Sequence, residues 1–333
     1  MLDQTPKSFV ELPSDERPLL LVVIDTEEEF DWAKPLAREN RSVASIAAQP
    51  KAQAIFADFG IVPTYVIDHP VASDSEAADL LRGFAEQRAC EIGAHLHPWV
   101  NPPHEESVTP RNSYPGNLPA ALERAKLEAL TETITAQFGV RPTIYKAGRY
   151  GLGPNTAETL KALGYRIDVS VVPYTSFADD GGPDFTAFDP RPYWHGEAPA
   201  LLEVPLTCGF CGLLRDWGGA LYPPLSGEAG MALHLPGFFA RSGLLERIRL
   251  TPEGVSFEEQ CRLTRSLFER GCRLFSYSYH SPSLAPGNTP YVRDEAELAA
   301  FLQRMRAYFD FFFCELGGRP LAVSALYEMA KSA

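Results

Sequence analysis

The stretch "LLLVVIDTEEEFDW", residues 19–32, decides the fold, because it joins an apolar strand to a group of acids. Its uninterrupted apolar run is typical of a strand covered on both faces, as in a parallel sheet flanked by helices. The run stops at Asp25, and four more carboxylates follow within six residues: Glu27, Glu28, Glu29 and Asp31. Carboxylates in this position can belong to a solvated loop, to a helix start or to a cation site.

Strand-like runs alternate with helical patterns along the rest of the chain. The runs cover residues 19–25, 61–68, 90–97, 141–148, 165–172, 200–206, 272–280 and 320–326. This alternation predicts an α/β fold, a distorted (β/α) barrel of about seven parallel strands. We expect residues 18–333 to form a single catalytic domain after a loose lead-in, residues 1–17. Two capping boxes mark expected helix starts, Ser73 with Glu76 and Ser256 with Glu259.

Composition excludes several classes of protein. The net charge is −13, and Lys and Arg form no long cluster, so a nucleic-acid partner is not expected. No apolar run reaches membrane-span length and no secretory signal is visible, so we expect a cytoplasmic protein with no membrane span. The six cysteines are scattered. The Cys208–Cys211 pair lacks the further Cys or His residues of a zinc site, and two ordinary thiols are expected.

Polar residues gather where the predicted strands end. The C-terminal strand ends of a barrel face its active site, and Pro- and Gly-rich inserts at 101–118 and 174–199 are expected around that mouth. The polar residues at strand ends are Asp25, Glu27, His95, His97, Lys146, Arg149, Asp168 and His280. The other four histidines are expected to be structural or surface residues: His69, His104, His195 and His234.

Spacing adds a reason to expect a metal. In an extended chain, residues i and i+2 point to the same side, so Asp25 can face one point with Glu27, and His95 with His97. Two imidazoles with one or two carboxylates are a zinc-type ligand set, although two histidines spaced this way can also be plain polar residues at a strand end. By the same alternation, Glu28 is expected to point elsewhere, into solvent.

Five segments together resemble the polysaccharide deacetylases of the NodB-homology class, carbohydrate esterase family 4, in a divergent WalW-like branch. The segments are "VVIDTEEEFDW", "CEIGAHLHPW", "IYKAGRYGLGP", "DVSVVP" and "YHSPSLAPGNTPY". The resemblance implies a distorted (β/α) barrel that removes acetyl groups from N-acetylated sugars. It also implies a divalent metal, usually zinc, held by a carboxylate and two histidines, with an Asp base, a late His acid and an Arg that steadies the base.

The match to the family pattern is incomplete. Asp25 corresponds to the base, but Thr26 stands where the family has its metal-binding Asp, so Glu27 is the expected substitute, unless the two acids exchange roles. His95 and His97 are closer in sequence than the family's histidine pair. Either Lys146 or Arg149 can take the place of the family's Arg, and His280 corresponds to the late His in order.

The resulting hypothesis is metal-dependent removal of an N-acetyl group from a sugar or saccharide precursor. His95, His97 and Glu27 are the expected ligands of Zn²⁺, and Asp25 and His280 the expected base and acid. Opening of a cyclic amide or imide, as in allantoinase-like relatives of this fold, is the first alternative. A non-catalytic binding barrel is the second, and a glycoside hydrolase with paired carboxylates ranks last. The sequence leaves the oligomeric state open.

Overall fold

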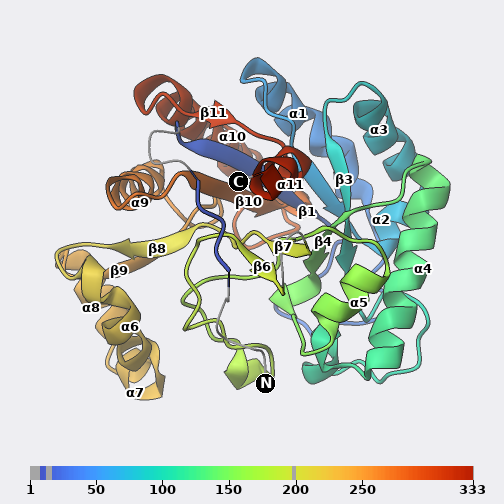
Figure 1. Cartoon of the computed structure of the whole chain (residues 1–333), viewed down its shortest axis with the longest axis horizontal. Helices are drawn as coiled ribbons and strands as arrows, with labels where there is room; N and C mark the ends of the chain where they lie inside the picture. The colour runs from blue at the N-terminus through green and yellow to red at the C-terminus, as the bar shows by residue number, and fades with distance from the viewer. Residues whose placement is uncertain (1–7, 13–16, 197–199, 333) are drawn as a thin grey trace.

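The computed structural model describes residues 8–12, 17–196 and 200–332, which contain a curled parallel sheet wrapped by helices (Figure 1). The strands are β1 (Leu19–Thr26), β2 (Thr64–Ile67), β3 (Glu91–Leu96), β4 (Ile144–Ala147), β5 (Ile167–Asp168), β6 (Tyr193–His195), β7 (Leu201–Glu203), β8 (Cys208–Cys211), β9 (Glu246–Arg249), β10 (Leu274–His280) and β11 (Arg319–Pro320). The main sheet has the order β10-β1-β2-β3-β4-β5-β7-β6, with β11 also pairing with β1. The seven strands from β10 to β7 in this order are all parallel to one another, which confirms the predicted distorted barrel.

Eleven α-helices lie in the described part of the chain. They are α1 (Gln49–Asp58), α2 (His69–Ser73), α3 (Ser75–Glu86), α4 (Ala120–Phe138), α5 (Thr156–Ala162), α6 (Gly218–Ser226), α7 (Glu228–Ala232), α8 (Leu235–Arg241), α9 (Phe257–Glu269), α10 (Glu295–Asp310) and α11 (Val323–Ser332). In Figure 1, α1, α3 and α4 lie on one side of the sheet strands and α9 on the other, while α6–α8 project at the lower left. Among the described residues, no helix combines the length and apolar character needed to cross a bilayer.

Both faces of β1 are buried, as its apolar run predicts. Leu20, Val22 and Ile24 belong to the core between sheet and helices. Leu19, Leu21 and Val23, on the opposite face, belong to the core inside the barrel. Asp25 continues this inner face and therefore points into the barrel mouth.

The parallel register brings distant residues together at that mouth. Asp25 lies opposite His280 on β10, and His95 on β3 lies opposite Lys146 on β4. On the side without a continuous ladder, three backbone hydrogen bonds link the strands: Leu206 N–H to Val171 O, Leu250 N–H to Thr207 O, and Ser278 N–H to Leu250 O. The barrel is thus held together partly by irregular segments.

Two expectations about the elements are corrected, and a third is confirmed. Only Pro320 of the run 320–326 lies in a strand, β11. The run then enters α11, in which the buried positions Val323, Leu326, Tyr327 and Ala330 follow the helical period. Asp74, not Ser73, caps α3 by accepting the Ala77 N–H at 2.9 Å, because residues 69–73 are already the separate helix α2. The box of Ser256 with Glu259 is confirmed.

The expected lead-in is partly ordered against the sheet. Val10 N–H donates to Pro192 O at 2.9 Å, and Phe9 forms a bridge with Tyr193. Residues 8–10 therefore pack beside β6 rather than forming a loose tail. The rest of the predicted lead-in at 1–7 and 13–16 lies outside the described residues.

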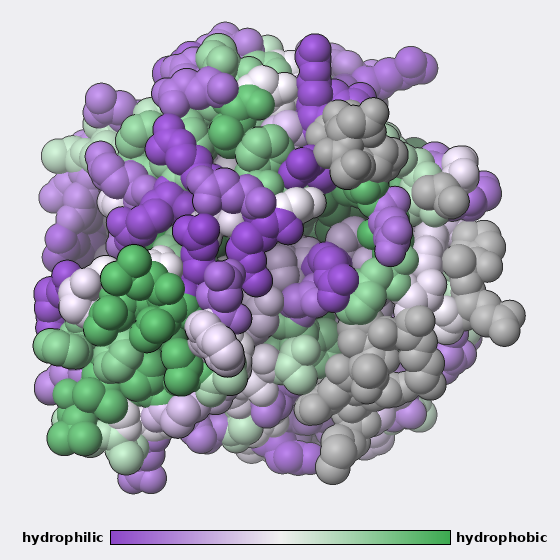
Figure 2. Space-filling model, turned by 60° about the vertical axis from the view of Figure 1, so that its left-hand side comes forward, coloured by the Kyte–Doolittle hydropathy of each residue, from purple (hydrophilic) through white to green (hydrophobic). Residues whose placement is uncertain are grey.

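The segment that carries α6–α8 is unusually apolar on its outside. Figure 2 shows a contiguous hydrophobic patch over it. The large apolar side chains exposed in this segment are Leu213, Trp217, Leu221, Met231, Leu233 and Phe238. Its three helices bury two glycines, Gly218 and Gly230, and no larger side chain. The segment is therefore a projection outside the barrel and takes no part in its core.

Candidate metal and catalytic site

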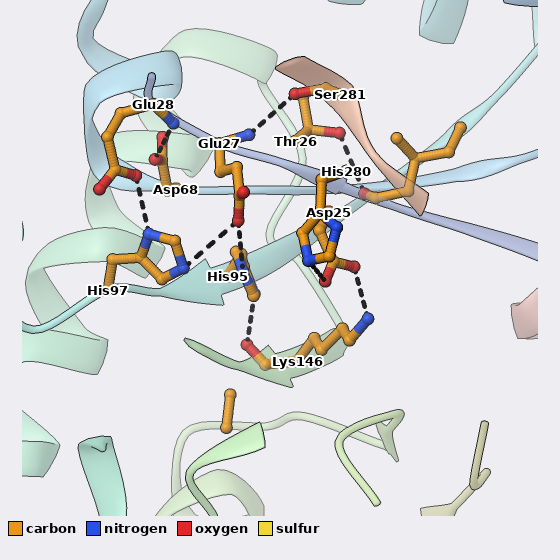
Figure 3. A network of polar contacts seen from close by, with 12 residues as sticks. Asp25, Thr26, Glu27, Glu28, Asp68, His95, His97, Lys146, His280 and Ser281 are labelled. Carbon is orange, nitrogen blue, oxygen red and sulfur yellow. Dashed lines mark hydrogen bonds and ion pairs between the residues drawn. The ribbon is translucent and has the colours of Figure 1, made fainter. Parts of the chain in front are cut away.

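Glu27, His95 and His97 meet at the end of β1 and β3 (Figure 3). The Nε2 atoms of both histidines lie 3.5 Å from the same oxygen, Oε2 of Glu27. All three side chains are buried, with relative exposures of 2% each. The second oxygen of this carboxylate, Oε1, is buried and has no hydrogen-bond partner among the described residues. This geometry brings together the three residues that the sequence predicts as metal ligands.

The other ring nitrogens fix the orientation of the two imidazoles. His95 Nδ1 lies 3.0 Å from the carbonyl oxygen of Lys146, and His97 Nδ1 lies 2.7 Å from Glu28 Oε2. Both partners are acceptors, so each Nδ1 carries the hydrogen and each Nε2 presents a lone pair. Histidines that bind metals are usually oriented in this way.

The charges of the group also favour a cation. Burial lowers the pKa of His97 to about 4, and burial and the neighbouring His97 lower the pKa of His95 well below its usual range. Burial and the nearby carboxylates of Asp25 and Glu28 raise the pKa of Glu27 far above its usual range. Two lone pairs therefore face a carboxylate oxygen, an arrangement that a bound divalent cation would stabilise. The donor set thus fits the metal that the family resemblance implies.

Glu28 is not solvated, contrary to expectation. Its side chain is fully buried, and it accepts hydrogen bonds from His97 Nδ1 and from Trp99 Nε1, both at 2.7 Å. Its own backbone N–H donates to Asp68 Oδ2 at 2.7 Å. Strand alternation does not apply here, because β1 ends at Thr26 and Glu28 lies in the irregular segment that follows it. Glu28, Asp68 and His97 could themselves hold a cation, but the hydrogen bonds already use these atoms.

Asp25 stands beside this group and pairs with Lys146. The Lys146 ammonium donates to Asp25 Oδ1 at 2.5 Å and to Ser278 Oγ at 3.3 Å. Burial alone would raise the pKa of Asp25, but the positive charge of Lys146, with that of His95 and His280, outweighs it and holds the pKa below its usual range. Asp25 is therefore kept ionised, as a general base requires.

Thr26 takes no part in the group. Its hydroxyl donates back to the carbonyl of Ile24 at 3.0 Å, and the residue is fully buried. Glu27 instead reaches the histidines, while Ser281 Oγ accepts the backbone N–H of Glu27 at 3.1 Å. Of the two acids between which the sequence cannot choose, Glu27 is the one that touches both imidazoles.

His280 lies on the other side of Asp25. Its Nε2 is 3.6 Å from Asp25 Oδ2, and its Nδ1 is 2.8 Å from Glu253 Oε2. Burial would lower the pKa of His280, but Glu253 above all, together with Asp25, outweighs burial and raises that pKa. Sequence reasoning missed Glu253, which precedes His280 by 27 residues in an irregular loop.

Arg149 does not pair with Asp25, so that alternative is wrong. It follows β4, has a positive φ of 53°, and donates to Ser113 Oγ at 2.6 Å and to Asp180. Its guanidinium also lies over the ring of Tyr114, 4.3 Å from the ring centre. Arg149 therefore belongs to the wall of the mouth, among the two inserts. Asp168 also lies elsewhere, because it points to the outer face of the sheet.

A pocket of about 470 Å³ opens above the group. Its lining includes Asp25, Glu27, His95, His97 and His280, together with aromatic residues and both inserts, as expected for a barrel mouth. Gly148 makes room for the metal-type group, because a Cβ atom there would lie 2.4 Å from His97 Cδ2. The aromatic residues of the lining are Phe30, Trp32, Trp99, Tyr114, Tyr150, Phe177 and Tyr291.

Comparison with solved structures shows where this fold occurs. The chain resembles a protein from Mycobacterium smegmatis assigned as a polysaccharide deacetylase, with a TM-score of 0.53 and 18% identity over 98% of this chain and 95% of that one. It resembles PuuE allantoinase with a TM-score of 0.53 and 14% identity, over 96% and 92% of the two chains. It also resembles a 4-alpha-glucanotransferase from Thermococcus litoralis, with a TM-score of 0.51 and 13% identity, over 94% of this chain and 40% of that one.

These similarities establish the NodB-type distorted barrel. No family model and no curated protein matches the sequence. Because the three solved structures are named for different reactions, the fold alone does not choose the chemistry, which has to be argued from the site.

Proposed function

We propose that this chain is a metal-dependent hydrolase of carbon–nitrogen bonds that removes an acetyl group from an N-acetylated saccharide. One observation carries the proposal. Glu27 Oε2 lies between two lone-pair nitrogens in a pocket that also holds an ionised Asp25 and a His280 whose pKa is raised. A metal-type ligand set, a base and an acid thus face one cavity.

Glu27, His95 and His97 would hold the ion. A divalent metal bound there supplies Lewis-acid polarisation of the acetyl carbonyl and of a water molecule. The protein's own share is to keep both histidines in the ligand tautomer, through the Lys146 carbonyl and Glu28. Burial of the group also strengthens the electrostatic interactions within it.

Asp25 and His280 would carry the protons. Lys146 occupies Asp25 Oδ1, which leaves Oδ2 to take the proton of the attacking water. The water oxygen forms a bond to the acyl carbon. The carbon–nitrogen bond then breaks as His280 Nε2 gives its proton to the leaving amine. Glu253 on Nδ1 keeps His280 protonated and correctly turned for this donation.

The pocket suits a small saccharide. Its volume of about 470 Å³ lies within the usual range for small-molecule sites, and aromatic residues line its wall. Arg249 adds positive charge to the same wall, whereas the charge of Arg149 is balanced by Asp180, and Arg249 would favour a substrate with an anionic group such as a phosphate or a carboxylate.

Metal content and acetate release test the proposal together. The wild-type chain, the His95→Ala variant and a matched His104→Ala control, whose histidine lies in an insert outside the pocket lining, are compared by elemental analysis and by acetate assay on N-acetylated sugars. We expect His95→Ala to lose both the metal and the activity and His104→Ala to keep both. Equal activity in metal-free wild-type protein would refute the mechanism, and a chain with neither metal nor activity would favour a binding protein.

Ring opening of a cyclic amide is a second candidate. It is favoured by the fold, which matches PuuE allantoinase as closely as the deacetylase by TM-score, and by Thr26 in the position of the family's metal-binding Asp. The same metal-type group and proton carriers can serve both reactions. Assaying allantoin and simple imides beside N-acetylated sugars separates the two, because ring opening releases no acetate.

A further inference from the structure

A second group of metal-type side chains lies on the other face of the sheet, where β5, β7 and β6 adjoin. Asp168 on β5 is in register with Glu203 on β7. The preceding residues, Ile167 and Leu202, pack inside the barrel. Asp168 and Glu203 therefore point outward, toward the helices. His195 on the antiparallel strand β6 adds its ring, and one ligand atom from each of these three side chains lies within 4.8 Å of the others.

In this outer cluster, each carboxylate accepts a hydrogen bond through one oxygen, while its second oxygen has none. Asp168 Oδ1 accepts the hydroxyl of Ser170, and Glu203 Oε1 accepts the backbone N–H of Val171 at 2.9 Å. Asp168 Oδ2 and Glu203 Oε2 are buried and have no hydrogen-bond partner among the described residues. His195 Nε2 lies 3.6 Å from Glu203 Oε2. Both unpaired oxygens are thus oriented by the protein toward the same small space as an imidazole.

Such an arrangement needs a positive partner. Asp168 and Glu203 are both fully buried, and buried carboxylate oxygens without donors cost several kcal/mol unless a proton or a cation offsets them. A shared proton would join the two carboxylates alone. A cation would instead bind both unpaired oxygens together with a ring nitrogen of His195, and a mixed set of one imidazole and two carboxylates suits transition metals such as zinc or manganese.

We propose that Asp168, His195 and Glu203 form a second site for a divalent transition-metal ion, separate from the pocket at the barrel mouth. The His195 side chain is 26% exposed, which gives the ion a route from solvent. The site ties together three short strands, with two residues in β5 and three each in β6 and β7. Its ion is structural, because it stabilises this end of the sheet where few ladder hydrogen bonds do so.

Metal stoichiometry tests the site directly. Apoprotein is titrated with zinc or manganese alone, and bound metal is counted by elemental analysis after dialysis for the wild type, His95→Ala, His195→Ala and the double variant. We expect two equivalents in the wild type, one in each single variant and none in the double variant. An exposed histidine outside both groups supplies the matched control, His234→Ala, which should keep two equivalents.

Thermal unfolding gives a second readout that does not depend on activity. In the His95→Ala background, a hundredfold excess of metal over its Kd should raise Tm by about 5 °C, and His195→Ala should abolish that rise. If His95→Ala binds no metal and shows no metal-dependent rise in Tm, the two carboxylates share a proton and the inference is overturned. Loss of activity in His95→Ala alone concerns the proposed function and leaves this inference untouched.

Discussion

Two clusters contain the same kinds of side chain in different surroundings. The mouth cluster is Glu27, His95 and His97, and the outer cluster is Asp168, His195 and Glu203. Both join imidazole to buried carboxylates with an unpaired oxygen. Beside the mouth cluster lie a pocket, an ionised Asp25 and the protonatable His280. The pocket lining, as far as the described residues form it, includes none of the outer three. The comparison shows that a set of metal ligands can support catalysis only where a substrate pocket and proton-carrying groups lie beside it.

The largest effect is expected from removing the base at the mouth. Asp25→Asn should lower kcat by about 10³-fold or more and leave the bound metal in place, because Asp25 contacts Lys146 and not the two histidines. Steady-state kinetics and elemental analysis of the same preparation check this. Asp31→Asn, an exposed acid of the same segment, is the matched control.

Asp25→Asn can also destabilise the fold, because it leaves the buried ammonium of Lys146 without its counter-charge. The double variant Asp25→Asn/Lys146→Met removes both charges and should recover stability without recovering activity. If Asp25→Asn lost the metal and Glu27→Gln kept it, the two acids would have the opposite roles.

A smaller effect on activity is expected from changing Glu28, which contacts the proposed ligand His97. Glu28→Gln removes the charge that accepts the His97 Nδ1 hydrogen, so metal affinity should fall by about 10- to 100-fold, while saturating metal restores most of kcat. Competition with a chelator of known affinity measures this. Glu29→Gln, the next acid along the chain, should leave the affinity unchanged, and an unchanged affinity in Glu28→Gln itself would show that Glu28 does not support the ligand.

The role of His280 as the acid should be visible in the dependence of kcat/KM on pH. Glu253 raises the pKa of His280, so His280 stays protonated to higher pH than it would without that carboxylate. Glu253→Gln should therefore lower the pKa and move the alkaline limb of kcat/KM to lower pH. The acid limb, set by Asp25, should stay where it is, and the plateau should fall by less than about tenfold. An alkaline limb that does not move would remove His280 as the acid.

The fold and the placement of His95, His97 and Lys146 at the mouth follow from the sequence, because short-range periodicity governs them. The apolar run of β1 predicts a buried parallel strand, and the i, i+2 spacing places His95 and His97 on one side of the chain at the end of β3. The same parity favours Lys146 over Arg149, since Lys146 lies in β4, two residues after the inward Ile144, and Arg149 lies beyond the strand. Parity also turns Asp168 outward, although its position at a strand end suggested the mouth.

The remaining partners could not be predicted, because they come from places where alternation stops. Glu28 follows the end of β1 and contacts His97 from an irregular segment. Glu253 lies in a loop and meets His280 through tertiary packing alone. Neither contact has a period or a spacing in the sequence. The sequence thus predicts the group of Glu27, His95 and His97 beside Asp25, but not the residues that orient their side chains.

The smallest effect on catalysis is expected from the outer cluster. Glu203→Gln should leave kcat and KM within about twofold at 25 °C, since Glu203 points away from the barrel interior and does not line the pocket. Tm should nevertheless fall, because the variant removes a ligand of the proposed structural ion. Kinetics and thermal unfolding of one preparation measure both quantities. A loss of activity of tenfold or more, with the mouth metal still bound, would mean that the two clusters are coupled through β5 and β7, and the division into a catalytic and a structural cluster would fail.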